Sequence, residues 1–309
     1  MKKNTVKKTA RSSVKIIEIM LIVVSLIALL LFCTGCGKAL PSVNSDTNLK
    51  NQYPINIYFF DVGKADSMLI ECDGEYVLID AGTADAADQV CANLKELGVK
   101  EIKTVFLSHP DKDHVGGMSA IIENFSIHEL VQSPISEHVL PSTDEYESFI
   151  AAAEKYGLNN NYATVGDVYT VGSASLTVLA PLDEYGDTNN DSMVLKLEYE
   201  RFSVLFCGDI EKKAEKDLVK SSADLSADVI KIPHHGSSNS STEDFLKAVG
   251  ASYAVISTGE NSKNLPKKSV LKRIKNLGAE IYRTDINGNI TCSYDGEKII
   301  LTTEYTIKE

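Results

Sequence analysis

The feature that most constrains this 309-residue chain is a run of metal-binding side chains directly after an apolar strand. Residues 102–107 (IKTVFL) predict a buried strand, and the next ten residues are SHPDKDHVGG. That segment holds four potential ligands within six positions, namely His109, Asp111, Asp113 and His114. Imidazole and carboxylate groups together suit zinc, manganese or iron. Gly116 and Gly117 let the backbone turn closely into the next helix. The pattern predicts a metal site, and the alternative is an acidic surface turn with incidental histidines.

Two later segments place further candidate ligands at strand ends. Asp209 follows the apolar stretch 202–207, where a carboxylate can bridge two ions. Its alternative role is the N-cap of a helix expected over 211–220. His234 and His235 follow the apolar stretch 228–232. One of them would complete a second metal position and the other would lie behind a ligand or near substrate; the order of the residues favours His234 as the ligand.

The rest of the body alternates strands with helices. Helical periodicity is found at 84–98, 117–124, 144–156, 211–220, 242–249 and 267–277. Strand patterns are found at 55–60, 67–72, 76–80, 102–108, 175–180, 192–200, 202–207, 228–232, 252–257 and in pieces of 290–303. This order predicts a mixed sheet or sandwich with helices outside. The body cysteines have no CxxC spacing and apolar neighbours, so we expect buried free thiols, although one disulfide is an alternative.

The N-terminus is predicted to lie outside the fold. A basic start precedes the apolar run IMLIVVSLIALLLF at 19–32, and Cys33-Thr34-Gly35-Cys36 follows. This arrangement is typical of a bacterial lipoprotein signal over 1–36 with lipidation at Cys36. The alternative is an uncleaved anchor helix from Ile16 to about Phe32. Residues 37–53 are polar and turn-rich, and they predict a tether before a domain at 54–309. Either anchor places that domain on the extracytoplasmic face of the cell membrane.

The net charge bears on the substrate. The formal charge is -12, which disfavours a protein that holds nucleic acid through a broad basic surface. It does not exclude an enzyme that acts on phosphodiesters through bound metal. Six basic residues cluster on and before the helix at 267–277, and we expect them to form a solvated helix face: Lys263, Lys267, Lys268, Lys272, Arg273 and Lys275.

The metal-binding segment resembles the HxHxDH motif of the metallo-β-lactamase superfamily. More closely, it resembles the HxDxDH variant in the extracytoplasmic domain of ComEC-type competence proteins. Five further segments resemble family motifs in the same order, namely YFFDVGKADS at 58–67, LIDAG at 78–82, NDSMV at 190–194, FCGD at 206–209 and KIPHHGS at 231–237. The resemblance implies an α/β fold, an αββα sandwich of two mixed sheets with flanking helices. It also implies two divalent metal ions, zinc or manganese, at the sandwich edge.

The resemblance also implies roles for individual residues. His109 and Asp111 would hold one ion, Asp113 and His114 the second, with Asp209 between them and His234 completing the second position. Asp113 or Asp209 would take a proton during attack by water, and His235 would lie near substrate. Four more residues are expected to support the site or contact substrate, with Asp80 in the turn below the metal loop and Asp66 near the site mouth: Asp66, Asp80, Asn190 and Ser192.

Three departures from the family pattern qualify this interpretation. Asn190 stands where the superfamily often has a histidine, and because asparagine is a poor metal ligand, fewer protein groups would hold the first ion. Asp111 replaces another histidine, which makes the first position oxygen-rich and favours manganese or magnesium over zinc. Lys64-Ala65 replaces Gln-Gly, and Leu265 replaces a late histidine. The expected function is a membrane-anchored, extracytoplasmic metal-dependent hydrolase acting on phosphodiesters, either DNA or a cell-envelope polymer. The alternative is a catalytically weak or inactive lipoprotein that serves as a binding module; the sequence indicates no protein partner.

Overall fold

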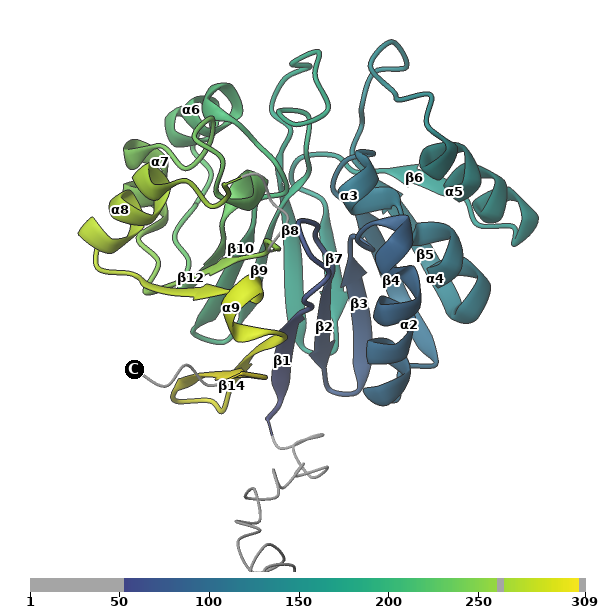
Figure 1. Cartoon of the computed structure of the whole chain (residues 1–309), viewed down its shortest axis with the longest axis horizontal. Helices are drawn as coiled ribbons and strands as arrows, with labels where there is room; N and C mark the ends of the chain where they lie inside the picture. The colour runs from purple at the N-terminus through teal and green to yellow at the C-terminus, as the bar shows by residue number, and fades with distance from the viewer. Residues whose placement is uncertain (1–52, 260–263, 306–309) are drawn as a thin grey trace, which may run out of the picture. The chain divides into compact units, whose positions relative to one another are not determined.

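A computed structural model describes residues 53–259 and 264–305, which form two stacked β-sheets with helices on both outer faces (Figure 1). The lipoprotein signal, the anchor and most of the tether expected at 1–53 lie outside the described residues. Within the described part of the chain, no helix combines the length and apolar character needed to cross a membrane.

The first sheet has eight strands in the order β15-β14-β1-β2-β3-β4-β5-β6. Strands β3 to β6 run parallel, and the remaining neighbours are antiparallel. The strand bounds are β1 (Ile55–Phe59), β2 (Met68–Cys72), β3 (Glu75–Ile79), β4 (Glu101–Leu107), β5 (Ser126–Gln132), β6 (Asn160–Tyr162), β14 (Ile290–Tyr294) and β15 (Ile299–Thr303).

The second sheet has seven strands in the order β13-β12-β11-β10-β9-β8-β7. Strands β10 to β13 run parallel, whereas β7, β8, β9 and β10 pair antiparallel. The strand bounds are β7 (Val168–Val171), β8 (Ala174–Ala180), β9 (Val194–Tyr199), β10 (Phe202–Phe206), β11 (Val229–Lys231), β12 (Tyr253–Ile256) and β13 (Glu280–Arg283).

Three helices cover each outer face (Figure 1). α2 (Ala87–Glu96), α4 (Met118–Asn124) and α5 (Asp144–Lys155) pack on the first sheet, and α6 (Lys212–Lys220), α7 (Glu243–Val249) and α8 (Lys268–Asn276) pack on the second. The short segments η1 (Ala84–Ala86), α3 (Lys112–Val115), η2 (Pro233–Gly236) and α9 (Thr284–Asn287) lie in connections between strands and helices.

Helix α5 shows how the local sequence sets these elements. The Thr143 side chain accepts a hydrogen bond from the Tyr146 backbone N–H, and acidic residues occupy the first turn. Tyr146, Phe149 and Ala153 are buried on one face at helical spacing. That apolar face packs against the first sheet, so capping and periodicity agree with the tertiary contacts.

The main core lies between the two sheets. Alternate side chains of β1, namely Ile55, Ile57 and Phe59, point into it and are fully buried. The Phe59 ring meets the Phe206 ring of the opposite sheet, with centroids 6.3 Å apart. Apolar contacts of this kind hold the two sheets face to face.

The expected αββα class is therefore confirmed, and each expected helix is found within about two residues of its predicted bounds. The sequence interpretation missed β5. Its segment SIHELVQ contains several polar residues, and only the first half of the strand is exposed or half-buried. It also missed the short strands β6, β7 and β13. The four body cysteines are free and buried, so the disulfide alternative is wrong for them: Cys72, Cys91, Cys207 and Cys292.

Candidate metal centre

The expected ligands come from the ends of three strands. His109 follows β4, Asp209 follows β10 and His234-His235 follow β11. One backbone hydrogen bond joins the two sheets at this edge, from Met193 N to Ser108 O at 2.8 Å, and a second joins the ends of the neighbouring strands β10 and β11, from His234 N to Gly208 O at 3.2 Å. Residues more than a hundred positions apart therefore meet at one edge, where α/β folds commonly bind ligands.

The metal loop is held in place by close backbone packing. Ala81 N donates to His114 O at 2.9 Å, and Asp66 N donates to Asp113 O at 3.0 Å. A Cβ at Gly117 would lie 2.2 Å from the Ala81 carbonyl oxygen, so only glycine fits there. This accounts for the Gly-Gly pair after the ligands.

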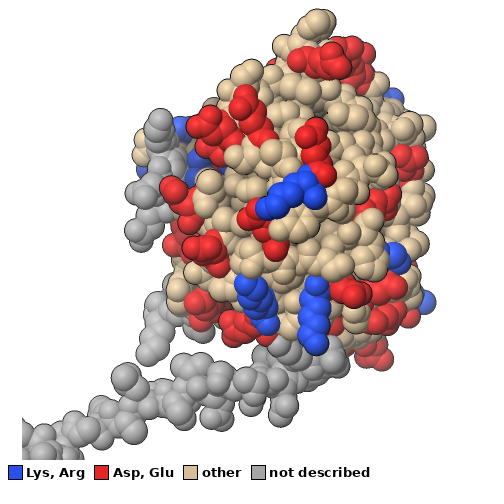
Figure 2. Space-filling view, turned by 90° about the vertical axis from the view of Figure 1, so that its right-hand side faces the viewer, with Lys and Arg blue, Asp and Glu red and all other residues tan. Residues whose placement is uncertain are grey.

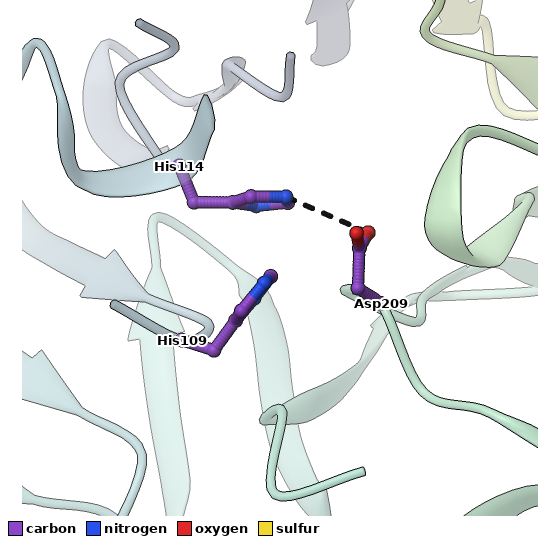
Figure 3. A group of neighbouring side chains, drawn as sticks. All are labelled: His109, His114 and Asp209. Atoms are coloured by element: carbon purple, nitrogen blue, oxygen red, sulfur yellow. Dashed lines mark ion pairs between the residues drawn. The ribbon is translucent and has the colours of Figure 1, made fainter. Parts of the chain in front are cut away.

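His109, His114 and Asp209 form the first group of candidate ligands (Figure 3). The two rings lie with centroids 4.0 Å apart, and His114 Nε2 lies 3.5 Å from Asp209 Oδ1. All three side chains are buried. Asp111 stands at the edge of this group, with its Oδ2 3.8 Å from His109 Nε2 and its side chain partly exposed.

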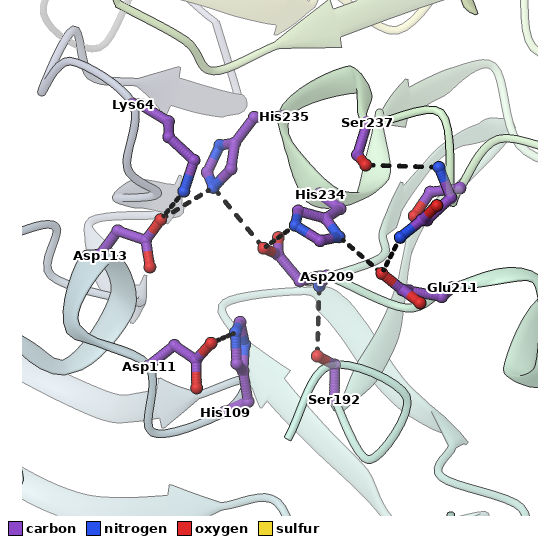
Figure 4. A network of polar contacts seen from close by, with 12 residues as sticks. Lys64, His109, Asp111, Asp113, Ser192, Asp209, Glu211, His234, His235 and Ser237 are labelled. Atoms are coloured by element: carbon purple, nitrogen blue, oxygen red, sulfur yellow. Dashed lines mark hydrogen bonds and ion pairs between the residues drawn. The ribbon is translucent and has the colours of Figure 1, made fainter. Parts of the chain in front are cut away.

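Asp113, His114 and His235 form a second group beside the first, and Figure 4 shows Asp113 and His235 facing each other. His235 Nε2 lies 3.4 Å from Asp113 Oδ2 and 3.6 Å from Asp209 Oδ2. Asp209 thus stands between the two groups, as expected of a carboxylate that bridges two ions. It is not the N-cap of α6, because that helix begins at Lys212 with Glu211 as its cap residue.

The donor atoms of these groups fit a metal ion. His109 Nε2, His114 Nε2, His235 Nε2 and Asp209 Oδ1 are buried and make no hydrogen bond within the described part of the chain. Buried polar atoms without partners cost free energy unless an ion or another partner satisfies them. Three imidazole nitrogens and a carboxylate oxygen that converge in this way match the preferences of zinc and manganese.

Asp80 orients one of the ligands from behind. Its carboxylate lies 2.8 Å from His114 Nδ1 and also accepts hydrogen bonds from the Ser108 N–H and hydroxyl, at 2.8 and 2.7 Å. Because Asp80 contacts the Nδ1 atom of His114, the Nε2 atom of that ring can face an ion. Asp66, Asp80 and His114 form a third group of neighbouring ligand atoms. We assign it to this supporting network and not to a separate metal site, because the Asp80 carboxylate already contacts Ser108 and His114.

The charges of the site are strongly coupled. Burial would lower the pKa of His114, but the carboxylates of Asp209 and Asp80 outweigh it and hold that pKa well above its ordinary value. Burial would raise the pKa of Asp209, yet His235, His114 and His109 hold it well below its ordinary value. Burial and the nearby His114 lower the pKa of His109. The ion-free site therefore carries carboxylates and at least one charged imidazole.

The structure reverses the expected order of the two adjacent histidines. His235 is fully buried with its Nε2 among the candidate ligands, whereas 20% of the His234 side chain is exposed. His234 instead contacts Glu211 Oε1 through its Nδ1 at 3.3 Å, and its Nε2 lies 3.9 Å from Asp209 (Figure 4). Both residues have left-handed backbone, with φ of 51° and 50°, which aims the second ring inward. We therefore assign His235 as the candidate ligand and place His234 at the rim.

Asp66 also lies elsewhere than expected. It is fully buried behind His235 rather than at the site mouth, with its Oδ1 3.6 Å from His235 Nδ1. Lys231 Nζ donates to Asp66 Oδ2 at 2.7 Å and to the Ile232 carbonyl oxygen. His235 Nδ1 also lies 2.9 Å from Ser257 O, so the Asp66 carboxylate and the Ser257 carbonyl together fix the imidazole ring from behind.

The segment at 190–194 supports the site without facing an ion. Asn190 Nδ2 donates to Asp187, and its Oδ1 accepts from the backbone N–H groups of Glu211 and Ala214. Asn190 thus caps α6 and its polar atoms are used there. Ser192 Oγ accepts from Asp209 N at 3.2 Å, which fixes the backbone of the bridging carboxylate.

Three polar residues were not named as site residues from the sequence. Ser108 binds Asp80, Lys231 binds Asp66, and Lys64 contacts Asp113. Each lies inside a motif that the sequence interpretation quoted, so the motifs were the available signal, but the pairings are long-range. His128 and His138 are exposed and belong to none of these ligand groups.

Fold and site together define a class: αββα sandwiches with a histidine- and carboxylate-lined metal centre at one edge. The family model described as the metallo-beta-lactamase superfamily matches residues 60–260, and this chain belongs to that superfamily. Among curated proteins, the chain is similar to ComE operon protein 3 of Bacillus subtilis, with 28% identity over 256 residues. It is also similar to competence protein ComA of Neisseria gonorrhoeae, with 29% identity over 245 residues.

These relatives are much longer than the region they share with this chain. The match covers 76% of this chain and 32% of the Bacillus protein, and 77% and 32% for the Neisseria protein. The solved structures agree on the fold. YhfI of Bacillus subtilis, a metallo-beta-lactamase fold protein, superposes with a TM-score of 0.52 at 11% identity, covering 77% of this chain and 99% of that one. Igni18, a metallo hydrolase from Ignicoccus hospitalis, gives a TM-score of 0.51 at 13% identity, covering 77% and 99%.

Proposed function

We propose that this protein is a metal-dependent hydrolase that acts on phosphodiesters at the extracytoplasmic face of the cell membrane. One observation carries the hydrolase assignment: in the described part of the chain, buried atoms of His109, His114, His235 and Asp209 that make no hydrogen bond converge at the edge of a metallo-beta-lactamase fold. A chain that keeps such mutually crowded ligands gains from them only when an ion is bound.

The reaction that this geometry favours is hydrolysis by an activated water. Divalent ions at these positions generate a nucleophile from water at neutral pH and stabilise negative charge on the attacked group. The chain's own residues hold and orient the centre. Asp209, which touches both ligand groups, is placed to accept a proton. His234 stands at the exposed rim against Glu211, where it can contact the substrate.

Phosphodiesters are the favoured substrate class for two reasons. One of the similar curated proteins is named a competence protein, and the carboxylates of Asp113 and Asp209 stand among the candidate ligands beside the imidazoles, a mixed set that suits manganese as well as zinc. The face in Figure 2 shows several groups of acidic side chains with scattered Lys and Arg, so it offers no broad basic surface for nucleic acid. The substrate would therefore be DNA held through the metal centre, or an anionic cell-envelope polymer.

One basic element lies close to the centre. Helix α8 begins beside η2, the segment that carries His235, because Lys267 N donates to Gly236 O at 2.9 Å. Lys268, Lys272 and Lys275 along this helix are exposed. These three lysines offer a polyanion only a short positively charged surface. Because few phosphate contacts release few counterions, we expect the activity to fall only shallowly as the salt concentration rises.

The membrane location rests on the sequence of residues 1–36 alone. The basic start, the apolar run and Cys36 favour a lipid anchor, and a membrane location suits an enzyme that meets extracellular nucleic acid or envelope polymers.

A non-catalytic binding module is the second candidate. Leu265 precedes Pro266, which packs so closely on Gly236 that a Cβ there would lie 2.5 Å from the proline Cβ. Leu265 is therefore next to a residue that packs on η2, the segment of His234 and His235, and it stands where the family has a histidine. Its side chain cannot move a proton or bind phosphate.

The deciding assay uses the full chain loaded with manganese and bis-p-nitrophenyl phosphate or single-stranded DNA as substrate. We expect metal-dependent turnover that Asp209→Asn abolishes and that the exposed Asp244→Asn control leaves unchanged. Leu265→His should raise turnover if this position meets the scissile group. Cleavage of β-lactams or lactones alone would refute the phosphodiester assignment. Full metal occupancy with no hydrolysis of any of these substrates would favour the binding module.

A further inference from the structure

Lys64 places a positive charge inside the candidate metal centre. It lies in the connection between β1 and β2, and its Nζ contacts Asp113 Oδ2 (Figure 4). The connection is held from both sides. Asp66 N bonds to Asp113 O at 3.0 Å, and Gly259 packs so closely that a Cβ there would lie 2.6 Å from Gly63 Cα. Lys64 is thus positioned at this carboxylate by its backbone.

The oxygen that Lys64 contacts is also the one that faces His235. Asp113 Oδ2 lies 3.4 Å from His235 Nε2, and Asp113, His114 and His235 are the second group of candidate ligands. A divalent ion held by that group would share its carboxylate oxygen with an ammonium. Two cations a few ångströms apart repel each other, and an engaged carboxylate donates less charge to either.

The effect of Lys64 is selective for one of the two positions. Asp113 is the ion-pair partner of Lys64 in the described part of the chain, while Asp209 and Asp66 attract it without forming such a pair. Asp113 does not belong to the first group of His109, His114 and Asp209. The Lys64 side chain is 39% exposed, so it has room to leave Asp113 when a stronger cation competes.

We propose that Lys64 acts as the second cation of this centre. Its ammonium holds Asp113 where a second divalent ion would bind. The chain therefore binds one ion tightly through His109, His114 and Asp209, and a second ion only weakly, after displacing Lys64. This inference rests on the proposed metal centre and specifies its stoichiometry.

The test measures metal binding rather than activity. Purified full-length protein in detergent is stripped with a chelator and titrated with Mn²⁺, with bound ion measured by equilibrium dialysis and magnetically coupled ion pairs by electron paramagnetic resonance. The wild type should bind one ion with a dissociation constant at least tenfold below that of the second. Lys64→Gln should tighten the second ion at least tenfold and give the coupled-pair signal at lower manganese.

Two control variants isolate the position of the charge. Lys64→Arg keeps the cation and should keep the weak second ion. Lys112→Gln removes the same charge from the position between Asp111 and Asp113, but the Lys112 side chain is 62% exposed and pairs with Glu145. The Lys112→Gln variant should bind both ions with wild-type affinity. Thermal unfolding in the absence of metal checks that each variant is folded.

Three results would overturn the inference. The first is two ions of equal affinity in the wild type, and the second is a Lys64→Gln variant whose second ion binds no tighter; both leave the hydrolase proposal standing. The third is no tightly bound ion in the wild type or in Lys64→Gln, which would overturn the metal centre itself together with the role of Lys64.

Discussion

The carboxylate of Asp80 offers the sharpest test of how the metal centre is supported, because the residue touches no ion itself. It is fully buried, lies 2.8 Å from His114 Nδ1 and accepts two hydrogen bonds from Ser108. We predict that Asp80→Asn weakens metal binding while the protein stays folded. Asparagine has the same shape and tolerates the left-handed backbone of this position, where φ is 57°.

The expected size follows from the role of Asp80 behind a ligand. Loss of such an outer carboxylate typically costs about 10- to 100-fold in metal affinity, or ~1.4–2.7 kcal/mol. At a metal concentration near 1,000 times the dissociation constant, bound ion stabilises the native state by about 4 kcal/mol. The variant should therefore lose a large part of the metal-induced rise in melting temperature, roughly 3 to 11 °C for a domain of this size.

The assay combines isothermal titration with Mn²⁺ and thermal unfolding with and without chelator. Asp88→Asn serves as the control, because Asp88 is exposed in the first turn of α2 and the charge change is the same. Wild-type metal affinity in Asp80→Asn would show that His114 is not an ion ligand oriented by Asp80. A loss of stability seen equally in chelator would mean that Asp80 acts on the fold alone.

Three further predictions address other parts of the chain. His235→Ala should lower the affinity for the second, weakly bound manganese ion at least tenfold, and His234→Ala should change it less than about threefold; the opposite order by equilibrium dialysis would refute the ligand choice. Asp209 and Asp80 raise the pKa of His114, so in the ion-free protein this residue's stabilisation is full below about pH 6.5 and is lost as pH rises through the raised pKa. Metal binding must expel that proton, so affinity should rise about tenfold per pH unit near neutrality, and a flat titration profile would refute a charged His114. Cys36→Ala should abolish lipidation, and an unmodified Cys36 within an intact N-terminal peptide of the wild type, seen by mass spectrometry, would favour the anchor helix instead.

Much of this fold could be predicted because each local pattern agrees with its tertiary environment. The periodic apolar residues of α5 face the first sheet, and the alternate residues of β1 face the core between the sheets. Strand β5 was missed because its first half carries His128 and Glu129 at positions that solvent reaches, which hides the strand pattern.

The candidate site divides in the same way. His109, Asp113 and His114 were recognised because they lie together after one strand, and Asp209 because it ends another. The pairing of Lys231 with Asp66 joins residues 165 positions apart, and no local pattern specifies such a contact.

The sequence by itself determined the helices, most of the strands and the position of metal-binding side chains at strand ends, because these features depend on periodicity and neighbours along the chain. Only the tertiary structure decided which side chains face the centre. His234 and His235 are adjacent and chemically identical, and the left-handed backbone of η2 sends one ring inward and the other to the rim. Asn190 is drawn into capping α6 by two backbone N–H groups of a distant segment. The direction of a side chain depends on backbone dihedral angles and on packing between distant segments, and neither is contained in the order of residues around it.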